Sequence, residues 1–272
     1  HRRLTMTDRL SEAIDWTRAD DGQFEGELTD EWANGSGAYG GIIAASLLRQ
    51  MTRTLDDEDQ SPRTLHAHLG APLRFEPATA RVRIDRRGRS ISQVSTRLSQ
   101  KDEVSATASA TFAGDRSESS PRTDLPRPDT PPPEEVEPAP DLPIMPVYLT
   151  NFFEMRFCIG DLPLSGSETA ETGGWLSTRE PFADGPELAV CLLDAWPPSV
   201  FPTYETFRRT VTVDHRFQFW EATDRDGTTH EPFLFHATSE IVDDGYARED
   251  AAVWSREGNL VATAQQLYAI LD

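Results

Sequence analysis

The hydrophobic pattern of the chain predicts two buried helices, each followed by strands. Residues 40–51 (GGIIAASLLRQM) are apolar on nearly all sides, which is typical of a buried helix. Residues 188–196 have the same character, and the two prolines that follow end that helix. Alternating apolar and polar positions predict strands over 81–84, 104–112 and 210–220. One buried helix followed by a run of antiparallel strands indicates an α+β unit whose sheet wraps around its helix.

The two halves of the chain repeat each other. Residues 86–112 and 243–268 both show a turn, a strand, a tight polar turn and a second strand. The Ala-Thr-Ala at 106–108 matches the one at 262–264. In this alignment Ala110 takes the place of Gln266. The sequence therefore predicts a duplicated unit whose second copy carries polar groups that the first copy lacks.

A proline-rich segment separates the two halves. Residues 115–146 hold ten of the twenty prolines, many acidic residues and almost no large apolar side chain. Proline stiffens such a stretch, and repulsion between its carboxylates extends it. We therefore expect an N-terminal unit over 1–114, a linker or surface strap over 115–146, and a C-terminal unit over 147–272.

Composition limits the functions that the chain can have. The formal charge of its 272 residues is −20, so its average field repels nucleic acid and anionic lipid. No apolar run approaches the roughly 20 residues of a membrane span, and the N-terminus lacks the apolar stretch of a secretory signal. Two cysteines provide neither a disulfide framework nor a four-cysteine zinc site. We expect a soluble, cytoplasmic protein with no nucleic-acid or membrane partner.

Several short motifs suggest chemistry that their surroundings do not favour. Residues 35–40 satisfy G-x-G-x-x-G, but a dinucleotide site requires a buried strand before the motif and alternating βαβ units after it. His66 and His68 share one face of a strand, yet metal ligation needs a third partner and none is evident nearby. Asp214 and His215 are adjacent on a strand, so their side chains point to opposite faces and cannot cooperate easily.

The order of these elements resembles the type II, TesB-like family of double-hotdog acyl-CoA thioesterases. The segments that carry the resemblance are WANGSGAYGGIIAASLL, TLHAHLGAPLRF, DRRGRSIS and VSATASATF in the first half, and GPELAVCLLDAWPPSVF, TVTVDHRFQF and NLVATAQQLYAI in the second. The resemblance covers both halves and leaves out the linker. It implies an α+β fold of two fused hotdog units, each an antiparallel sheet wrapped around one long helix.

The resemblance also implies a hydrolytic site in the second half. In that family an aspartate, a threonine or serine, and a glutamine form the site. The matching positions are Asp194 in LLDAW, Thr212 in T-V-D-H, and Gln266 after V-A-x-x-x. Gln265 is adjacent, and a shift of one residue would exchange the two glutamines and the faces they occupy.

The chemistry of these residue types agrees with that assignment. Thioester hydrolysis needs a water made nucleophilic, and a carboxylate on an apolar helix is suited to act as its base. A hydroxyl and an amide can hold the water in line with the carbonyl. The developing oxyanion needs fixed donors, for which Tyr39, Gly40 and Gly41 at the start of the first helix are the candidates.

A basic run provides a second candidate contact with the substrate. Arg81 and Arg83 lie on one face of a predicted strand and could receive the phosphates of CoA. The alternative is a solvated strand whose charges prevent edge-to-edge aggregation. The sequence alone leaves both interpretations open.

The predicted function is therefore acyl-CoA hydrolysis to free acid and CoA, with no metal or organic cofactor and with a homodimer as the expected assembly. Two alternatives remain at this point. One is a hotdog-fold hydratase or dehydratase, whose usual D-x-N-x-x-H spacing does not occur here. The other is a non-catalytic acyl-CoA binder, which the asymmetry between the two halves disfavours.

Overall fold

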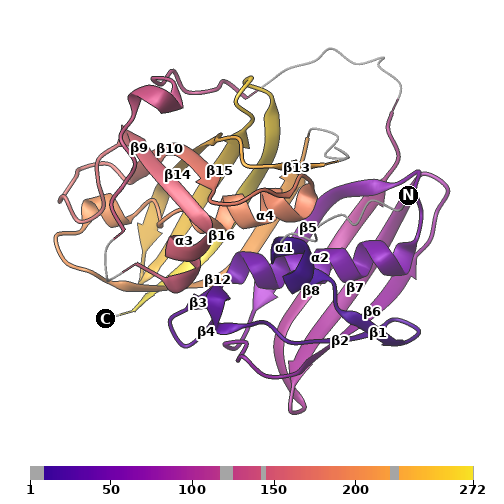
Figure 1. The fold of residues 1–272 in the computed structure, drawn as a ribbon. Coiled ribbons are helices and arrows are strands. Elements are labelled where there is room, and N and C mark those ends of the chain that lie inside the picture. Colours follow the sequence, from indigo (N-terminus) through magenta and orange to yellow (C-terminus); the bar gives the residue numbers. More distant parts are fainter. Residues whose placement is uncertain (1–8, 117–124, 142–144, 221–226, 272) are drawn as a thin grey trace.

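Both halves of the chain contribute to one antiparallel sheet. The computed structural model describes residues 9–116, 125–141, 145–220 and 227–271. Its main sheet has twelve strands in the order β1-β2-β6-β7-β8-β5-β12-β16-β15-β14-β10-β9. The first six belong to the N-terminal half and the last six to the C-terminal half, and the two sets lie side by side (Figure 1).

The N-terminal unit contains the longer of the two central helices. Its elements are α1 (Arg9–Ile14), β1 (Thr17–Asp20), β2 (Gln23–Gly26), the 3₁₀ turn η1 (Asp30–Trp32), β3 (Ala33–Asn34), β4 (Gly37–Ala38), α2 (Gly40–Leu55), β5 (Ser61–Leu69), β6 (Ala78–Arg86), β7 (Ile91–Gln100) and β8 (Glu103–Ala113).

The C-terminal unit repeats the plan of one central helix and a following set of strands. Its elements, with the strap before it, are η2 (Pro133–Glu135), α3 (Val147–Phe152), β9 (Phe153–Gly160), β10 (Glu171–Thr178), β11 (Phe182–Ala183), α4 (Pro186–Ala195), η3 (Phe201–Thr203), β12 (Arg209–Phe219), β13 (Thr228–Thr229), β14 (Phe233–Asp243), β15 (Tyr246–Trp254) and β16 (Leu260–Leu271).

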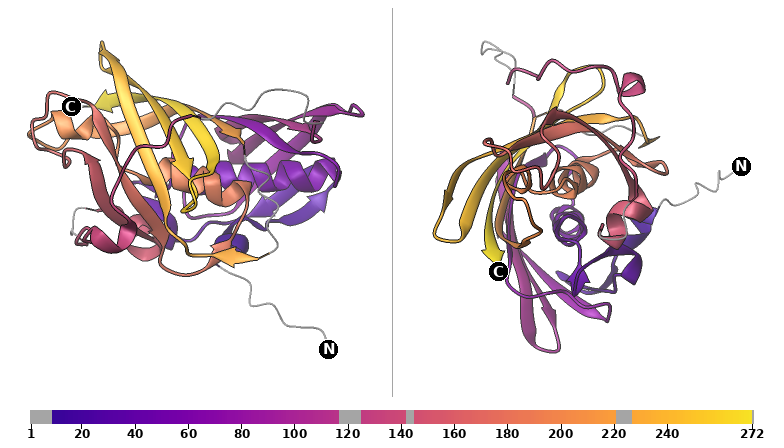
Figure 2. Two further views of the ribbon diagram at one scale, coloured as in Figure 1. Left: turned by 90° about the horizontal axis from the view of Figure 1, so that it is seen from above. Right: turned by 90° about the vertical axis from the view of Figure 1, so that its left-hand side faces the viewer.

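The two units join through their central strands and their helices. β5 pairs antiparallel with β12, with His68 opposite Asp214 and Thr64 opposite Gln218. On the inner face, α2 and α4 pack against each other, and the sheet curves around them (Figure 2). This arrangement confirms the predicted α+β fold of two units, each a sheet wrapped around one helix.

The ends of the two helices position the residues discussed below. α2 extends one turn beyond the predicted range because Leu55 continues its buried face, and it ends at Asp56 in the left-handed conformation. α4 ends at Ala195, since Pro197 disfavours a helical conformation for Trp196 before it. Asp194 therefore lies in the last turn of α4, at the inner face of the sheet.

The proline-rich strap lies along the outer face of the C-terminal sheet. Trp175 Nε1 donates a hydrogen bond of 2.8 Å to the Pro131 carbonyl, and Arg156 donates one of 2.6 Å to the Val136 carbonyl. Trp175 and Trp254 belong to a small apolar cluster that Val136 covers. Residues 117–124 and 142–144 of the predicted linker lie outside the described residues. No helix among the described residues is both long and apolar enough to cross a lipid bilayer.

An aromatic stack ties the two units together and provides a test of this packing. The Trp32 and Phe152 rings stack with centroids 3.9 Å apart, and Trp32 is buried. Trp32→Ala should lower the free energy of unfolding by about 3–5 kcal/mol, because it leaves a large cavity at this junction. The melting temperature followed by circular dichroism should fall by about 10 °C. Trp220→Ala, at an exposed tryptophan, is the matched control, and equal melting temperatures for both variants would contradict this packing.

Candidate functional site

The Asp194 carboxylate lies where the two central helices meet. Its side chain is 9% exposed, and its Oδ1 lies 3.3 Å from Nδ1 of His215 on β12. Its Oδ2 lies so close to Gly40 that a Cβ at that position would be 2.8 Å away. Gly40 is the first residue of α2, so the carboxylate sits at the positive end of that helix's dipole. The C-terminal unit thus supplies the acid, and the N-terminal unit stabilises its negative charge.

His215 is the buried partner that the sequence did not reveal. Its side chain is 3% exposed, and its Nε2 has no hydrogen-bond partner among the described residues. The prediction that Asp214 and His215 point to opposite faces is confirmed, because Asp214 contacts His66 and His68 on the outer face. The partner of His215 comes instead from α4. The inward alternation of His215 with Phe217 and Phe219 is the sequence signal that places this imidazole in the core.

Thr212 and Gln266 form a hydrogen-bonded pair on the same inner face. Thr212 Oγ1 donates to Gln266 Oε1 over 3.3 Å. In the pairing of β12 with β16, His215 lies opposite Gln266 and Thr212 opposite Tyr268. The register shifts between Thr212 and Asp214. This bulge brings Thr212 and His215, three residues apart, to one face of the sheet. Asp194, His215, Gln266 and Thr212 therefore occupy neighbouring positions.

A buried carboxylate orients the Gln266 amide. Gln266 Nε2 donates a 2.8 Å hydrogen bond to Glu249 Oε1, while the Ser199 N–H donates one of 2.6 Å to Glu249 Oε2. Both ends of the amide are thus fixed, with its oxygen toward Thr212. Gln265 lies on the outer face, where it donates to Asp250. The structure therefore places Gln266 opposite His215, the residue that contacts Asp194, whereas Gln265 lies on the other face of the sheet.

Neutral tyrosines surround the carboxylate. Burial raises the pKa of the Tyr39, Tyr148 and Tyr268 hydroxyls well above the ordinary value, and the negative charge of Asp194 adds to each shift. The Tyr39 and Tyr148 rings stack with centroids 4.0 Å apart, and the Tyr39 hydroxyl donates to the Cys191 carbonyl. These contacts hold the start of α2 against α4, so the position of Asp194 depends on both helices.

Two of the candidate oxyanion donors, Gly40 and Gly41, lie at the same place. Tyr39 does not serve as the third, because its N–H donates to the Trp32 carbonyl over 2.9 Å and its hydroxyl donates to the Cys191 carbonyl. Tyr39 is the N-cap of α2, and Gly40 and Gly41 form its first turn. Backbone N–H groups in a first turn have no acceptor within their own helix. A Cβ at Gly41 would collide with the Tyr39 side chain, as one at Gly40 would collide with Asp194. Glycine at position 40 thus keeps the backbone close to the carboxylate, and glycine at position 41 leaves space for the Tyr39 side chain.

The strand register supports the asymmetry between the two copies. Leu65 and Val94 pair with Ala110 in the first unit, from the strands on either side of β8. His215 and Glu249 pair with Gln266 in the same way in the second unit. Three apolar residues of the first copy therefore correspond to an imidazole, a carboxylate and an amide in the second.

The structure does not bring the predicted phosphate contacts to this site. Along β6, Ala80 and Val82 point into the core, so Arg81 and Arg83, which alternate with them, are exposed on the outer face. Arg83 Nε donates to Asp85 Oδ1 over 2.6 Å. Three strands separate β6 from β12 in the sheet. Arg81 and Arg83 therefore have the environment of a solvated strand face, which is the alternative that the sequence left open.

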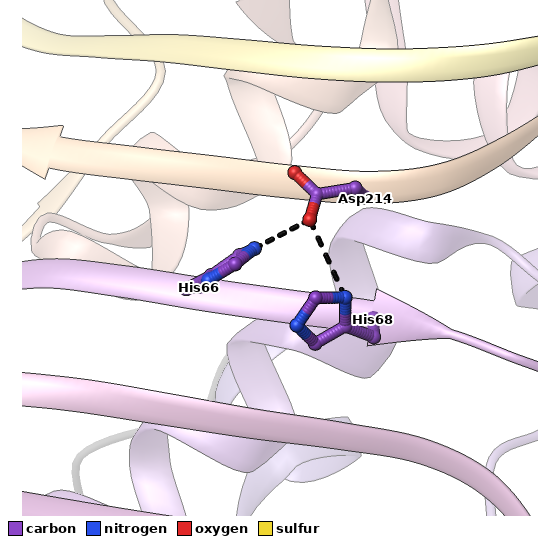
Figure 3. A group of neighbouring side chains, drawn as sticks. All are labelled: His66, His68 and Asp214. Atoms are coloured by element: carbon purple, nitrogen blue, oxygen red, sulfur yellow. Dashed lines mark hydrogen bonds and ion pairs between the residues drawn. The ribbon is translucent and has the colours of Figure 1, made fainter.

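The third partner that His66 and His68 lacked in the sequence is Asp214. The ligand atoms of these three side chains lie within 4.8 Å of one another on the outer face (Figure 3). Asp214 is 148 residues from His66 along the chain. The pairing of β5 with β12 brings them together.

The outer face also has a large groove. Its volume is about 950 Å³, and Leu125–Pro128 of the strap form one wall. The sheet side includes His66, Arg216, Gln218 and His236. Asp194, Thr212 and Gln266 are not among its lining residues, so the groove is distinct from the inner-face cluster.

Comparisons with known proteins agree with this architecture. The family model for the acyl-CoA thioesterase N-terminal domain matches residues 28–113, and the model for the acyl-CoA thioesterase C-terminal domain matches residues 121–270. No curated protein matches the chain.

Solved structures of similar fold cover nearly the whole chain. A hot-dog-fold protein of unknown function from Alicyclobacillus acidocaldarius is 26% identical, with a TM-score of 0.87 over 98% of this chain and 99% of its own. A TesB protein from Mycobacterium avium subspecies paratuberculosis is 18% identical, with a TM-score of 0.78 over 97% and 98% of the two chains. An acyl-CoA thioesterase II from Mycobacterium marinum is 19% identical, with a TM-score of 0.73 over 96% and 97%.

Proposed function

The chain belongs to the acyl-CoA thioesterase family and is a thioester hydrolase, and we propose that it cleaves acyl-CoA with a water molecule held by Asp194. The observation that carries this proposal is the position of one buried carboxylate. Asp194 meets the start of α2 on one side and His215 on the other, and His215 lies opposite Gln266 in the sheet.

Asp194 acts as the general base in this proposal. It takes a proton from the water as the water oxygen bonds to the thioester carbonyl carbon. The tetrahedral intermediate then expels the CoA sulfur, and the proton held on Asp194 returns to that sulfur. The products are the free acid and the CoA thiol, and the enzyme ends in its starting protonation state.

Thr212 and Gln266 orient the water. Each has an oxygen that can accept a hydrogen bond, and their mutual bond of 3.3 Å fixes the two oxygens relative to each other. Because Glu249 holds the amide nitrogen, Gln266 cannot turn its donor toward the site. His215 is a positioning residue, since it contacts the carboxylate of Asp194. Holding reactants in one geometry removes a large part of the entropic cost of the reaction.

The start of α2 stabilises the oxyanion. First-turn N–H groups carry partial positive charge that is fixed before the reaction begins, and such preorganised donors lower the barrier. Gly40 and Gly41 can contribute their N–H groups because neither residue has a side chain of its own to block the approach of the substrate. The acyl chain would then lie along the apolar inner face between the helices and the sheet.

The test is release of CoA thiol from a series of acyl-CoA esters of increasing chain length, followed with a chromogenic thiol reagent. We expect catalytic release with at least one chain length. A hydratase would release no thiol, and a non-catalytic binder would bind acyl-CoA in calorimetry without release. Either of those two outcomes would overturn the proposed function.

The protein's own thiols should contribute little to that signal. Burial raises the pKa of the Cys191 thiol well above its ordinary value, and burial also raises the pKa of Cys158. A raised pKa keeps a thiol protonated and unreactive at pH 8. In native protein without substrate, we expect less than about one thiol equivalent to react within minutes, and both to react after denaturation. Immediate reaction of both in the native protein would contradict this environment.

A further inference from the structure

We propose that His66, His68 and Asp214 form a binding site for a divalent transition-metal ion of the Zn²⁺ type on the outer face of the sheet. This site is separate from the proposed thioesterase site, since Asp214 and the neighbouring His215 point to opposite faces. Figure 3 shows both imidazoles on β5 directed at the one carboxylate on β12.

The three side chains already converge. His66 Nε2 lies 2.5 Å and His68 Nδ1 3.3 Å from the same oxygen, Oδ2 of Asp214. The two imidazole rings have centroids 4.2 Å apart. The spacing of two residues on β5 places both rings on one face, and the strand pairing sets His68 directly opposite Asp214. A small outward rotation of the side chains would separate the donor atoms enough to surround an ion.

The donor set suits a borderline transition metal. Two imidazole nitrogens and one carboxylate oxygen are a common ligand set for Zn²⁺, with bonds of about 2.0–2.2 Å. Three protein ligands leave a coordination position open to water. Ca²⁺ and Mg²⁺ prefer all-oxygen sites, so the two histidines disfavour them.

Arg216 is the group that opposes metal binding. Its Nε lies 3.4 Å from His66 Nε2 and 3.6 Å from Asp214 Oδ1. The guanidinium therefore stands beside the carboxylate that an incoming cation would use. Arg216 is 60% exposed, so it can turn into solvent when the ion enters. Its removal should strengthen metal binding, which is the opposite of what removal of a ligand should do.

A bound ion would connect the two units at their junction. His66 and His68 belong to the N-terminal unit and Asp214 to the C-terminal unit, on the strand pair that joins the sheets. Binding to the folded state alone raises its stability. We therefore expect the metal to stabilise the protein against unfolding and to leave its thiol-release rate unchanged.

The test is to treat the full chain with a chelator, remove the chelator, and follow thermal unfolding at increasing Zn²⁺ concentrations. Isothermal titration calorimetry then measures the affinity and the number of ions bound per chain. The wild type should bind one ion per chain, and saturating Zn²⁺ should raise the melting temperature by about 5 °C. Asp214→Asn and His68→Ala should each weaken binding by about tenfold or more. Arg216→Gln should tighten it several-fold.

His236→Ala is the matched control. His236 pairs with a single carboxylate, that of Glu171. The substitution therefore removes a histidine that is not one of the three proposed metal ligands. It should leave the metal-induced shift unchanged. Equal shifts for the wild type, Asp214→Asn and His68→Ala would overturn the proposal, as would loss of the shift in His236→Ala alone. Neither result would bear on acyl-CoA hydrolysis, which is measured separately.

Discussion

Replacing Asp194 with asparagine should lower kcat for acyl-CoA hydrolysis by about a thousandfold, within the range typical for loss of a general base. The amide keeps the size and much of the hydrogen bonding of the carboxylate but cannot take a proton from water at neutral pH. Asparagine has the same shape and size as aspartate, so it can occupy the same position beside His215 and Gly40. Folding and acyl-CoA affinity should therefore change little, and thiol release at saturating substrate measures the effect.

Asp250→Asn provides the matched control for this variant. Asp250 lies on the outer face of β15, where it accepts a hydrogen bond from Gln265. The same chemical change there should leave kcat within about twofold of the wild type, because surface changes away from a site have small effects. If Asp194→Asn kept more than about a tenth of wild-type kcat while Asp250→Asn behaved normally, the general-base role would have to be abandoned.

Gly40→Ala should lower kcat by about a hundredfold, because a displacement of about 1 Å in a reacting group can cost that much. The added Cβ would lie 2.8 Å from Asp194 Oδ2 and 3.0 Å from a methyl of Leu69. The carboxylate is the more mobile neighbour, so we expect it to move away from the start of α2. Alanine is otherwise the better helix former, which offsets the strain in the free energy of unfolding.

Gly70→Ala is the matched control for Gly40→Ala. A Cβ at Gly70 would have its nearest neighbour at 3.7 Å, an ordinary contact. Its kcat should match the wild type. The informative result is a Gly40→Ala protein with near-normal melting temperature and much lower turnover. Normal turnover in that protein would mean that the carboxylate's position at α2 is unimportant for the reaction.

Periodicity was sufficient to predict the central helices, several strands and the α+β class, whereas the two fused hotdog units came from the family resemblance. The helix expected over 40–51 and the strand expected over 210–220 occur as Gly40–Leu55 and Arg209–Phe219. Both elements have long runs of regularly spaced apolar residues, so local sequence determines them strongly. The duplication was equally visible, because both copies keep the same order of turn, strand, polar turn and strand, although residues 101–102 join β7 to β8 and residues 255–259 join β15 to β16. The path of the strap over Trp175 could not be predicted from the sequence, because a proline-rich segment has no periodicity to indicate what it covers.

The candidate site was only partly visible in the sequence. The family resemblance suggested Asp194, Thr212 and Gln266, and their roles remain predictions. The partnership of Asp194 with His215 could not be foreseen, because it depends on how α4 packs against the inner face of the sheet. The bulge after Thr212 is a feature of strand pairing rather than of composition. For the same reason no third partner of His66 and His68 was evident before the structure, in which the junction of β5 with β12 supplies Asp214.

The most direct test is a crystal structure with a non-hydrolysable acyl-CoA ketone, in which a methylene replaces the thioester sulfur. We predict that its carbonyl carbon lies on the inner face between Asp194 and the start of α2. Its oxygen should lie toward the Gly40 and Gly41 N–H groups, with one water between the carbon and the Asp194 carboxylate. A carbonyl bound instead in the outer groove beside His66 and Arg216 would contradict this account.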